Sequence, residues 1–481
     1  MRLYVVLRYS GLVMLFAALF MAVSAVVSFL NGMDSSFYPL VMSALLTAML
    51  GSFPMLFVPK IEQISNKEGF CIVVGSWIMA CVVGMFPYLM WGGEFSLANA
   101  WFESVSGFTT TGATILKDIE ALPKGLLFWR SCTAWLGGVG VVMFALVILP
   151  SLGKTKMTLS NVELSSLAKD NYRYRTQQIV RILMVVYMGL TAITALLLKL
   201  AGMGWFDAVN HGMSACATCG FSTRNLSIAY YDNPFVELIM MGAMTLSGIH
   251  FGLIYATIIG NSKNIFRSEV TRTYFSVIAT GTLLVTLSLY FGHVYPDLLT
   301  SLRHSVFQFV SIITTSGFAT ADTNTWTTFA ILLLIFASVI CSCAGSTSGG
   351  LKIDRLLLFG KMLKARMRRQ QHPNAVIRLK VDGVIQEGEL LNTVVVFMVT
   401  YMAVVFIAAV VNALFGLDMM TAVSSAISCL GNVGPAFGEV GSMSNFASLP
   451  MALKLQDTVL MLMGRLEIFG FIQLFFLKWW R

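Results

Sequence analysis

The chain has 481 residues, of which 57% are hydrophobic and only 11% are charged, and its mean hydropathy is +0.78. An ordinary soluble domain carries about 25% charged residues, so this composition excludes a soluble globular protein, a disordered chain and a secreted disulfide scaffold. The net charge of +9 would suggest nucleic acid as a partner if the protein were soluble. The composition instead indicates a polytopic membrane protein.

Ten apolar stretches follow one another along the chain, each close to the roughly 20 residues that cross about 30 Å of hydrocarbon. They lie near residues 11–30, 38–58, 70–91, 126–149, 179–200, 235–259, 273–292, 327–343 with a continuation after 350, 391–415 and 451–477. The first continues to Leu30, which fits an uncleaved helix better than a signal peptide. Because ten is an even number, both termini are expected on the same side of the membrane.

Most of the 32 Lys and Arg residues fall in the segments that share a side with the termini, whereas the opposite loops are poor in Lys and Arg and carry acidic residues. This bias follows the positive-inside rule. It predicts cytoplasmic termini and explains the basic charge without nucleic acid. The largest basic stretch, Lys361–Arg378, is too short for a domain. Docking of a cytosolic partner is the preferred interpretation of this stretch, and contact with anionic lipid is the alternative.

A fourfold internal repeat is the most informative feature of the sequence. In each copy a Ser is followed, after five residues, by a Gly that opens a polar stretch. The copies run from Ser106 to Gly112, from Ser214 to Gly220, from Ser311 to Gly317 and from Ser428 to Gly434. Each follows an apolar run too short to cross a bilayer, near residues 96–108, 205–217, 301–313 and 418–430, and lies between two long spans on the outer side.

This repeat predicts an all-α polytopic membrane protein in which four units of span, re-entrant pore helix, glycine loop and span surround one pore. Two additional transmembrane helices precede them, in residues 1–68. The expected units cover residues 69–152, 176–262, 270–370, with a broken second helix, and 387–481.

Four such loops favour a pore because non-helical backbone survives at membrane depth only where protein buries it or water reaches it. Glycine allows strained backbone angles and a close approach of carbonyl groups to the axis. Rings of carbonyl oxygens can replace the hydration shell of an ion, and the negative C-terminal ends of the short helices favour cations. A single copy would indicate only a helix C-cap and a turn.

The four loops read Thr110-Thr111-Gly112, Thr218-Cys219-Gly220, Thr315-Ser316-Gly317 and Asn432-Val433-Gly434. Together with Cys343–Leu351 and Gly464-Arg465-Leu466-Glu467, they resemble the motifs of the Trk/Ktr/HKT superfamily of potassium transporters, and the similarity covers essentially the whole chain. The resemblance implies that these loop residues form the potassium filter of an uptake pore in the bacterial inner membrane, with potassium as substrate and the only metal.

The same resemblance implies a homodimer gated by a cytosolic, nucleotide-binding ring of the TrkA type. Nucleotide is therefore expected on that partner only, and no cofactor is expected on this chain. None of the four loops reads TVGYG, and they differ from one another. We therefore expect an asymmetric filter that prefers potassium over sodium less stringently than a tetrameric potassium channel.

The second long span of the third unit is interrupted by a polar, glycine-containing segment. It comprises Ala344, Gly345, Ser346, Thr347, Ser348, Gly349 and Gly350. Because a membrane helix tolerates such a break only beside protein or water, this segment is expected to enter the pore below the filter. The family resemblance implies a gating loop, and a simple kink or small-residue packing is the alternative. A Walker A loop is excluded because Leu351 stands where Lys is required.

Arg465 lies in an apolar run near the C-terminus, where a charge costs at least about 2.5–3.5 kcal/mol and indicates a function. A fixed cation below the filter would oppose the passage of potassium, so Arg465 is predicted to be part of the gate. The alternative is a structural salt bridge with Glu467, Glu103 or Glu237. Glu467 is a poor candidate, because residues two apart on a helix do not face each other.

No motif indicates catalysis, and the histidines have no metal-ligand spacing, so the chain is not expected to be an enzyme. Cys216 and Cys219 have redox-motif spacing but follow a membrane helix, which favours packed thiols over a disulfide or zinc site. A gated potassium conduit is the preferred function. A potassium:proton or potassium:sodium symporter with the same filter is the alternative, and a non-transporting scaffold subunit is the third. No Asp or Glu lies in the filter loops to carry a coupled proton.

Overall fold

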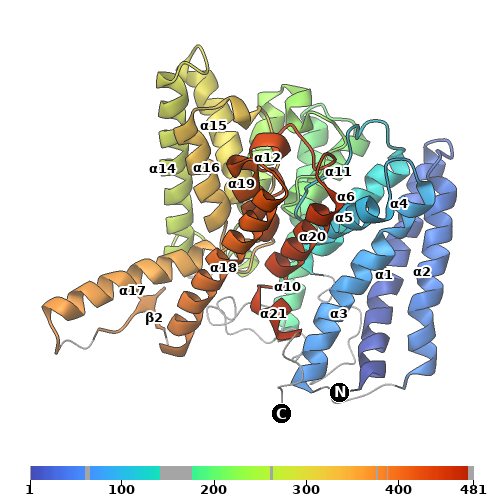
Figure 1. Ribbon diagram of the computed structural model, residues 1–481, viewed down its shortest axis with the longest axis horizontal. Coiled ribbons are helices and arrows are strands. Elements are labelled where there is room, and N and C mark those ends of the chain that lie inside the picture. The colour runs from blue at the N-terminus through green and yellow to red at the C-terminus, as the bar shows by residue number, and fades with distance from the viewer. Residues whose placement is uncertain are drawn as a thin grey trace.

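The computed structural model describes residues 2–59, 65–140, 176–260, 264–374, 377–386 and 388–474. Most of these residues are helical (Figure 1). Helices α1 (Leu3–Leu30) and α2 (Phe37–Phe57) form an N-terminal hairpin along one flank of the bundle, and α1 packs against α3 and α6. This pair corresponds to the two additional N-terminal helices expected from the sequence.

The described residues of the rest of the chain repeat one order of elements four times: a long helix, a short helix, a loop and a second helix that bends or ends early. The first unit contains α3 (Asn66–Gly84), α4 (Phe86–Trp91), α5 (Leu97–Phe108) and α6 (Lys124–Val139). The second contains α10 (Thr176–Leu200), α11 (Trp205–Cys216), η1 (Ser227–Tyr231), α12 (Pro234–Ser247) and α13 (Phe251–Ile258).

The third unit contains α14 (Glu269–Phe291), α15 (Leu298–Ile313), η2 (Thr323–Thr325), α16 (Thr328–Ile340) and α17 (Ile353–Gln371). The fourth contains α18 (Gly388–Leu414), α19 (Met419–Gly431), η3 (Gly438–Val440), α20 (Met451–Arg465) and α21 (Phe469–Ile472). Between α17 and α18, strands β1 (Lys380–Val381) and β2 (Val384–Ile385) pair antiparallel, with Lys380 opposite Ile385. Helix α17 extends sideways away from the bundle, and the hairpin returns the chain to α18 (Figure 1).

Six helical segments of the described chain are long and apolar enough to cross a membrane, and the bent pair α12–α13 makes a seventh. The protein is therefore a multi-pass membrane protein, although fewer of its spans are continuous than the ten apolar stretches suggested. The chain turns by 104° between α12 and α13. The expected spans at 327–343 and 451–477 contain the shorter helices α16 and α20. The expected span at 126–149 begins as α6, and its part beyond Gly140 lies outside the described residues.

The breaks share a physical cause, because they occur where polar or glycine residues lie inside an apolar stretch. At the α12–α13 bend, His250 caps α13 by accepting a hydrogen bond from the Gly252 N–H at 2.9 Å. After α16, Cys341 has a φ of +59°, which ends the helix. Broken helices survive in a membrane only beside protein or water. These breaks therefore belong in the interior of the bundle, where Ser247, Ile249 and Cys341 are buried.

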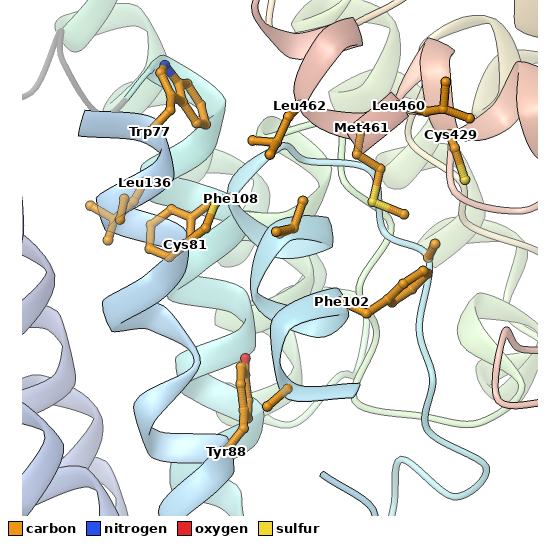
Figure 2. Close-up of a cluster of buried hydrophobic side chains, with 14 of the residues drawn as sticks. Trp77, Cys81, Tyr88, Phe102, Phe108, Leu136, Cys429, Leu460, Met461 and Leu462 are labelled. Atoms are coloured by element: carbon orange, nitrogen blue, oxygen red, sulfur yellow. The ribbon is translucent and has the colours of Figure 1, made fainter. Parts of the chain in front are cut away.

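A hydrophobic cluster joins the first unit to the fourth, far apart in sequence (Figure 2). Trp77 of α3, Phe102 and Phe108 of α5, and Met461 of α20 contribute to it, and all four side chains are nearly inaccessible to solvent. Phe102 also lies against Phe446, with ring centroids 5.5 Å apart. This contact between the ends of the repeat closes the units into a ring.

Candidate ion pathway

The short helices α5, α11, α15 and α19 all end in the same hydrogen-bond pattern. In each, a backbone N–H donates to the carbonyl of the residue five positions earlier. These bonds run from Thr111 to Ser106 (2.9 Å), from Cys219 to Ser214 (3.1 Å), from Ser316 to Ser311 (2.8 Å) and from Val433 to Ser428 (2.9 Å). A second bond in each loop closes three residues back, which makes the pair a Schellman motif. The Ser-x5-Gly spacing thus marks a helix C-cap in each copy.

In each loop, the residue whose N–H donates this second bond adopts a left-handed conformation. The φ angles are +57° at Thr110, +52° at Thr218, +55° at Thr315 and +54° at Asn432. Asn tolerates this region, but a β-branched residue in it is an outlier and costs of order 1–3 kcal/mol. Three threonines therefore hold strained backbone at equivalent positions, and strain of this kind concentrates at functional sites.

The glycines two residues further on bring the four loops together. Each has a positive φ: +80° at Gly112, +91° at Gly220, +71° at Gly317 and +98° at Gly434. A methyl group added to any of them would collide with a backbone carbonyl of the next loop. The carbonyls met are those of Cys219, Ser316, Val433 and Thr111, respectively. The contacts pass from loop one to two, three, four and back to one, so the loops form a closed ring of backbone.

All the loop residues singled out from the sequence lie in this ring, which we call the glycine-loop ring: Thr110 to Gly112, Thr218 to Gly220, Thr315 to Gly317 and Asn432 to Gly434. The side chains of Thr111 and Ser316 bond to the hydroxyls of Thr109 (2.8 Å) and Thr314 (2.9 Å). The amide of Asn432 donates to the Thr111 hydroxyl at 2.9 Å and so joins the fourth loop to the first.

A buried ion pair supports the ring beside the second loop. Arg130 of α6 and Glu103 of α5 lie 2.8 Å apart with both side chains almost fully buried. Arg130 also donates to the Ser222 carbonyl (3.3 Å) and stacks over the Phe221 ring, which follows the second loop. Removing one partner of a buried pair is strongly destabilising. Sequence analysis overlooked Arg130. Its charge inside the apolar stretch 126–149 could have identified it, because a charged residue in a membrane span needs a partner or a function.

The 344–350 loop lies against the C-terminal ends of three of the short helices. The Thr347 hydroxyl donates to the Cys216 carbonyl at 3.1 Å and lies 3.2 Å from the Thr218 hydroxyl. The Gly349 N–H donates to the Thr315 hydroxyl at 3.3 Å. A methyl group at Gly349 would meet the Gly431 carbonyl at the end of α19. The loop thus borders the second, third and fourth glycine loops.

Arg465 connects this loop to the first unit. Its guanidinium donates to the Thr347 carbonyl (2.8 Å) and to the carbonyls of Gly138 (3.0 Å) and Gly137 in α6. The three acids considered as structural partners bind other bases. Glu467 pairs with Lys352 and Arg355, Glu103 with Arg130, and Glu237 with Arg303. Arg465 therefore bridges the 344–350 loop and the second helix of the first unit.

Carboxylates lie on the side where the short helices begin. A hydrogen bond from the Asn225 side chain lowers the pKa of Asp118. The backbone N–H of Thr300 lowers the pKa of Asp297, and hydrogen bonds from Thr421 lower that of Asp418. Asp297 and Asp418 also cap α15 and α19. These groups stay ionised in mild acid and create a negative potential that attracts cations.

A bundle whose re-entrant helices end in a closed ring of backbone loops defines a class of multi-pass membrane transport proteins rather than enzymes. The chain belongs to the TrkH family of cation transport proteins, whose family model matches residues 43–479. The similarity to the Trk/Ktr/HKT superfamily inferred from the loops is thereby confirmed.

Individual relatives agree with this membership. The Trk system potassium uptake protein TrkH of Salmonella typhimurium is 36% identical over 422 residues, or 87% of each chain. The Trk system potassium uptake protein TrkG of Escherichia coli is 35% identical over 425 residues, covering 87% of this chain and 86% of that protein. The crystal structure of the potassium transporter TrkH from Vibrio parahaemolyticus matches all of both chains with a TM-score of 0.89 and 30% identity.

Proposed function

We propose that this protein takes up potassium across the bacterial inner membrane through a gated pore, with the glycine-loop ring as an asymmetric carbonyl filter. The observation that carries the proposal is the closed order of contacts among the four loops. Backbone carbonyls gathered at the negative ends of four helices suit a dehydrated cation. The names of its relatives, which are potassium uptake proteins, agree with this substrate.

The asymmetry follows from the loop sequences, because three loops carry Thr and the fourth carries Asn at the left-handed position. Flux of potassium and sodium into vesicles that contain the purified protein tests the proposal. Potassium flux should exceed sodium flux, by less than in a tetrameric potassium channel. Equal permeability to the two ions would contradict the filter.

The 344–350 loop and Arg465 form the gate of this pore. The loop borders three of the four glycine loops, and the guanidinium of Arg465 holds it to α6. A fixed positive charge at this place opposes the passage of a cation. Single-channel recording in bilayers separates a gated conduit, which gives unitary currents, from a symporter, which gives slow flux tied to a proton or sodium gradient.

The arm formed by α17, β1 and β2 is the docking site for a cytosolic, nucleotide-binding ring of the TrkA type, which controls the gate in a homodimer with cytoplasmic termini. The arm is basic along α17, with Lys361, Lys364, Arg366, Arg368 and Arg369. It is anchored where Asp382 accepts hydrogen bonds from the Ser268 hydroxyl (2.9 Å) and the Glu269 N–H (2.6 Å). Because α17 begins directly after the 344–350 loop, a displacement of the arm reaches the gate.

Charge reversal on the arm tests this part of the proposal. The double substitution Lys364→Glu and Arg368→Glu should abolish co-purification with the regulatory ring while the basal flux persists. Undiminished co-purification would contradict docking at α17.

A further inference from the structure

Asp457, in the middle of α20, is a buried acid that the ion pairs of the described residues do not include. The residue is 1% exposed, and its Oδ1 atom has no hydrogen-bond partner within the described part of the chain. Its carboxyl group contacts the thiol of Cys429 in α19. Among the other buried acids of the described chain, Glu68, Glu103, Asp207 and Glu237 each pair with an arginine, and Asp354 accepts the Ala344 N–H. Asp457 therefore needs an explanation.

The bases nearest to Asp457 along its helix are occupied elsewhere. Lys454, one turn earlier, donates to the Asn99 side chain (3.1 Å) and to the Ala447 carbonyl (2.9 Å). Arg465, two turns later, bonds to the carbonyls beside the gate.

The titratable groups on the neighbouring helices do not neutralise the carboxyl either. On α5, Glu103 is bound to Arg130. The thiol of Cys429 comes from α19, and Tyr401 of α18 contributes a buried phenol near Gly431. An ionised carboxylate in such a place is expensive, so the group is stable there as the neutral acid.

A proton fits this site better than a metal ion. Hard cations require several oxygen ligands, whereas the contact of Asp457 is a thiol. Moreover, the described residues contain no group of three His, Cys, Asp or Glu side chains that could hold a metal.

The surroundings of Asp457 lead directly to the glycine-loop ring. The Cys429 carbonyl accepts the Asn432 N–H, at 3.4 Å, in the closing turn of α19. The Asn432 amide in turn donates to the carbonyl of Met461, one turn after Asp457, at 3.0 Å, and to the Thr111 hydroxyl. A charge that appeared on Asp457 would therefore act on both elements that hold Asn432.

We propose that Asp457 is a proton-binding site behind the fourth glycine loop, and that the loop conducts when the carboxyl group is protonated. A proton taken from water converts the carboxylate to the neutral acid, and its release at high pH leaves an unpaired charge that displaces Cys429 and Asn432. The effect on flux rests on the proposed potassium function, but the occupancy of the proton site does not.

Two measurements on the full-length protein in lipid vesicles test this site. Difference infrared spectra should contain a carboxylic-acid band at neutral pH that disappears in Asp457→Asn. Potassium flux should fall at least tenfold from neutral to alkaline pH in the unmodified protein and stay constant in Asp457→Asn, whose side chain is permanently neutral. Asp457→Glu should restore the pH dependence, and Glu389→Gln, at the exposed start of α18, should retain it.

The outcomes separate the two proposals. An unchanged acid band, or an unchanged pH profile in Asp457→Asn, would overturn the proton site. The acid band could disappear in Asp457→Asn while the unmodified protein shows no potassium flux at any pH. That result would support the proton site and contradict the proposed function. If Asp457→Asn does not fold, Cys429→Ala provides the second variant. Removing the thiol contact should move the midpoint of the pH profile to higher pH, and an unmoved midpoint would overturn the proposal.

Discussion

The glycine-loop ring and the 344–350 loop are both glycine-containing, non-helical segments buried inside the bundle, yet they are held in different ways. In the ring, each glycine lies so close to a backbone carbonyl of the next loop that a Cβ atom would not fit between them. The 344–350 loop makes one such approach, from Gly349 to the Gly431 carbonyl. It is otherwise held mainly by hydrogen bonds that involve the side chains of Thr347 and Arg465.

This difference indicates which segment is able to move. Opening the ring would break the four contacts between each glycine and the carbonyl of the next loop. These contacts depend on one another and on the strained backbone of the threonines beside them. Withdrawing the 344–350 loop exchanges a few hydrogen bonds, each worth about 0.5–1.5 kcal/mol, or about 1.5–3 kcal/mol where a charged group takes part. These two constructions suit the rigid filter and the movable gate that we propose.

The largest effect is expected from Gly220→Ala. Gly220 has a φ of +91°, and an added methyl group would collide with the Ser316 carbonyl and with Gly317. Strain of about 3 kcal/mol corresponds to a loss of about a hundredfold in flux. Potassium flux into vesicles measures this loss. Gly242→Ala is the matched control, since its methyl group would meet no atom within 4 Å. Equal flux in both variants would show that the ring is not the pathway.

A smaller effect in the opposite direction is expected from Arg465→Ala. The substitution removes the bonds to Thr347 and Gly138 together with a positive charge from the proposed pathway. Basal flux without the regulatory partner should rise about tenfold, which corresponds to about 1.4 kcal/mol. Arg465→Lys keeps the charge and should leave basal flux low. Unchanged flux in Arg465→Ala would support a purely structural role.

The 344–350 loop itself is tested by Gly349→Ala, in which the methyl group would crowd the Gly431 carbonyl and the Asn432 side chain. The closed position of the loop becomes less favourable, so basal flux should rise severalfold and respond less to the regulatory partner. Gly360→Ala in α17 is a control, because the added methyl group meets no atom within 4 Å. The gate assignment fails if Gly349→Ala and a short deletion in the loop both leave flux and regulation unchanged.

The smallest effect concerns the strain within the ring. Thr110 has a left-handed backbone, and its hydroxyl has no hydrogen-bond partner among the described residues. Thr110→Asn should therefore stabilise the protein by about 1 kcal/mol, measured as a higher midpoint of thermal unfolding in detergent. The reverse change, Asn432→Thr, should destabilise it. Equal midpoints for the two variants would contradict the assignment of strain to threonine.

Much of the candidate site was predictable because its signals are local. The Ser-x5-Gly pattern contains one complete Schellman motif. The groups that form this turn lie in the six residues from the Ser to the residue before the Gly. The 344–350 loop and Arg465 were recognisable as polar groups inside apolar stretches. The continuous spans α1, α2, α10, α14 and α18 were predictable for the same reason, since apolar length alone defines them.

Other features could not be read from the chain because they depend on contacts between distant segments. The sequence offered Glu467, Glu103 and Glu237 as alternative partners of Arg465. Only the structure shows that each of these acids pairs with another base. Asp457 was overlooked because only the folded bundle shows that no base among the described residues forms an ion pair with it. The bends of the second helices also depend on neighbours that satisfy the exposed backbone.

By itself, then, the sequence determined a multi-pass membrane protein, the four loops with their shared turn, and the charged and glycine-rich exceptions within its apolar stretches. Hydrophobic length and helix capping depend on residues a few positions apart, so they can be read directly from the chain. The tertiary structure decided the cyclic order of the loops, the partners of Arg465 and the isolation of Asp457. Those features arise from groups up to several hundred residues apart, such as Asn432 and Thr111, which only packing brings within bonding distance.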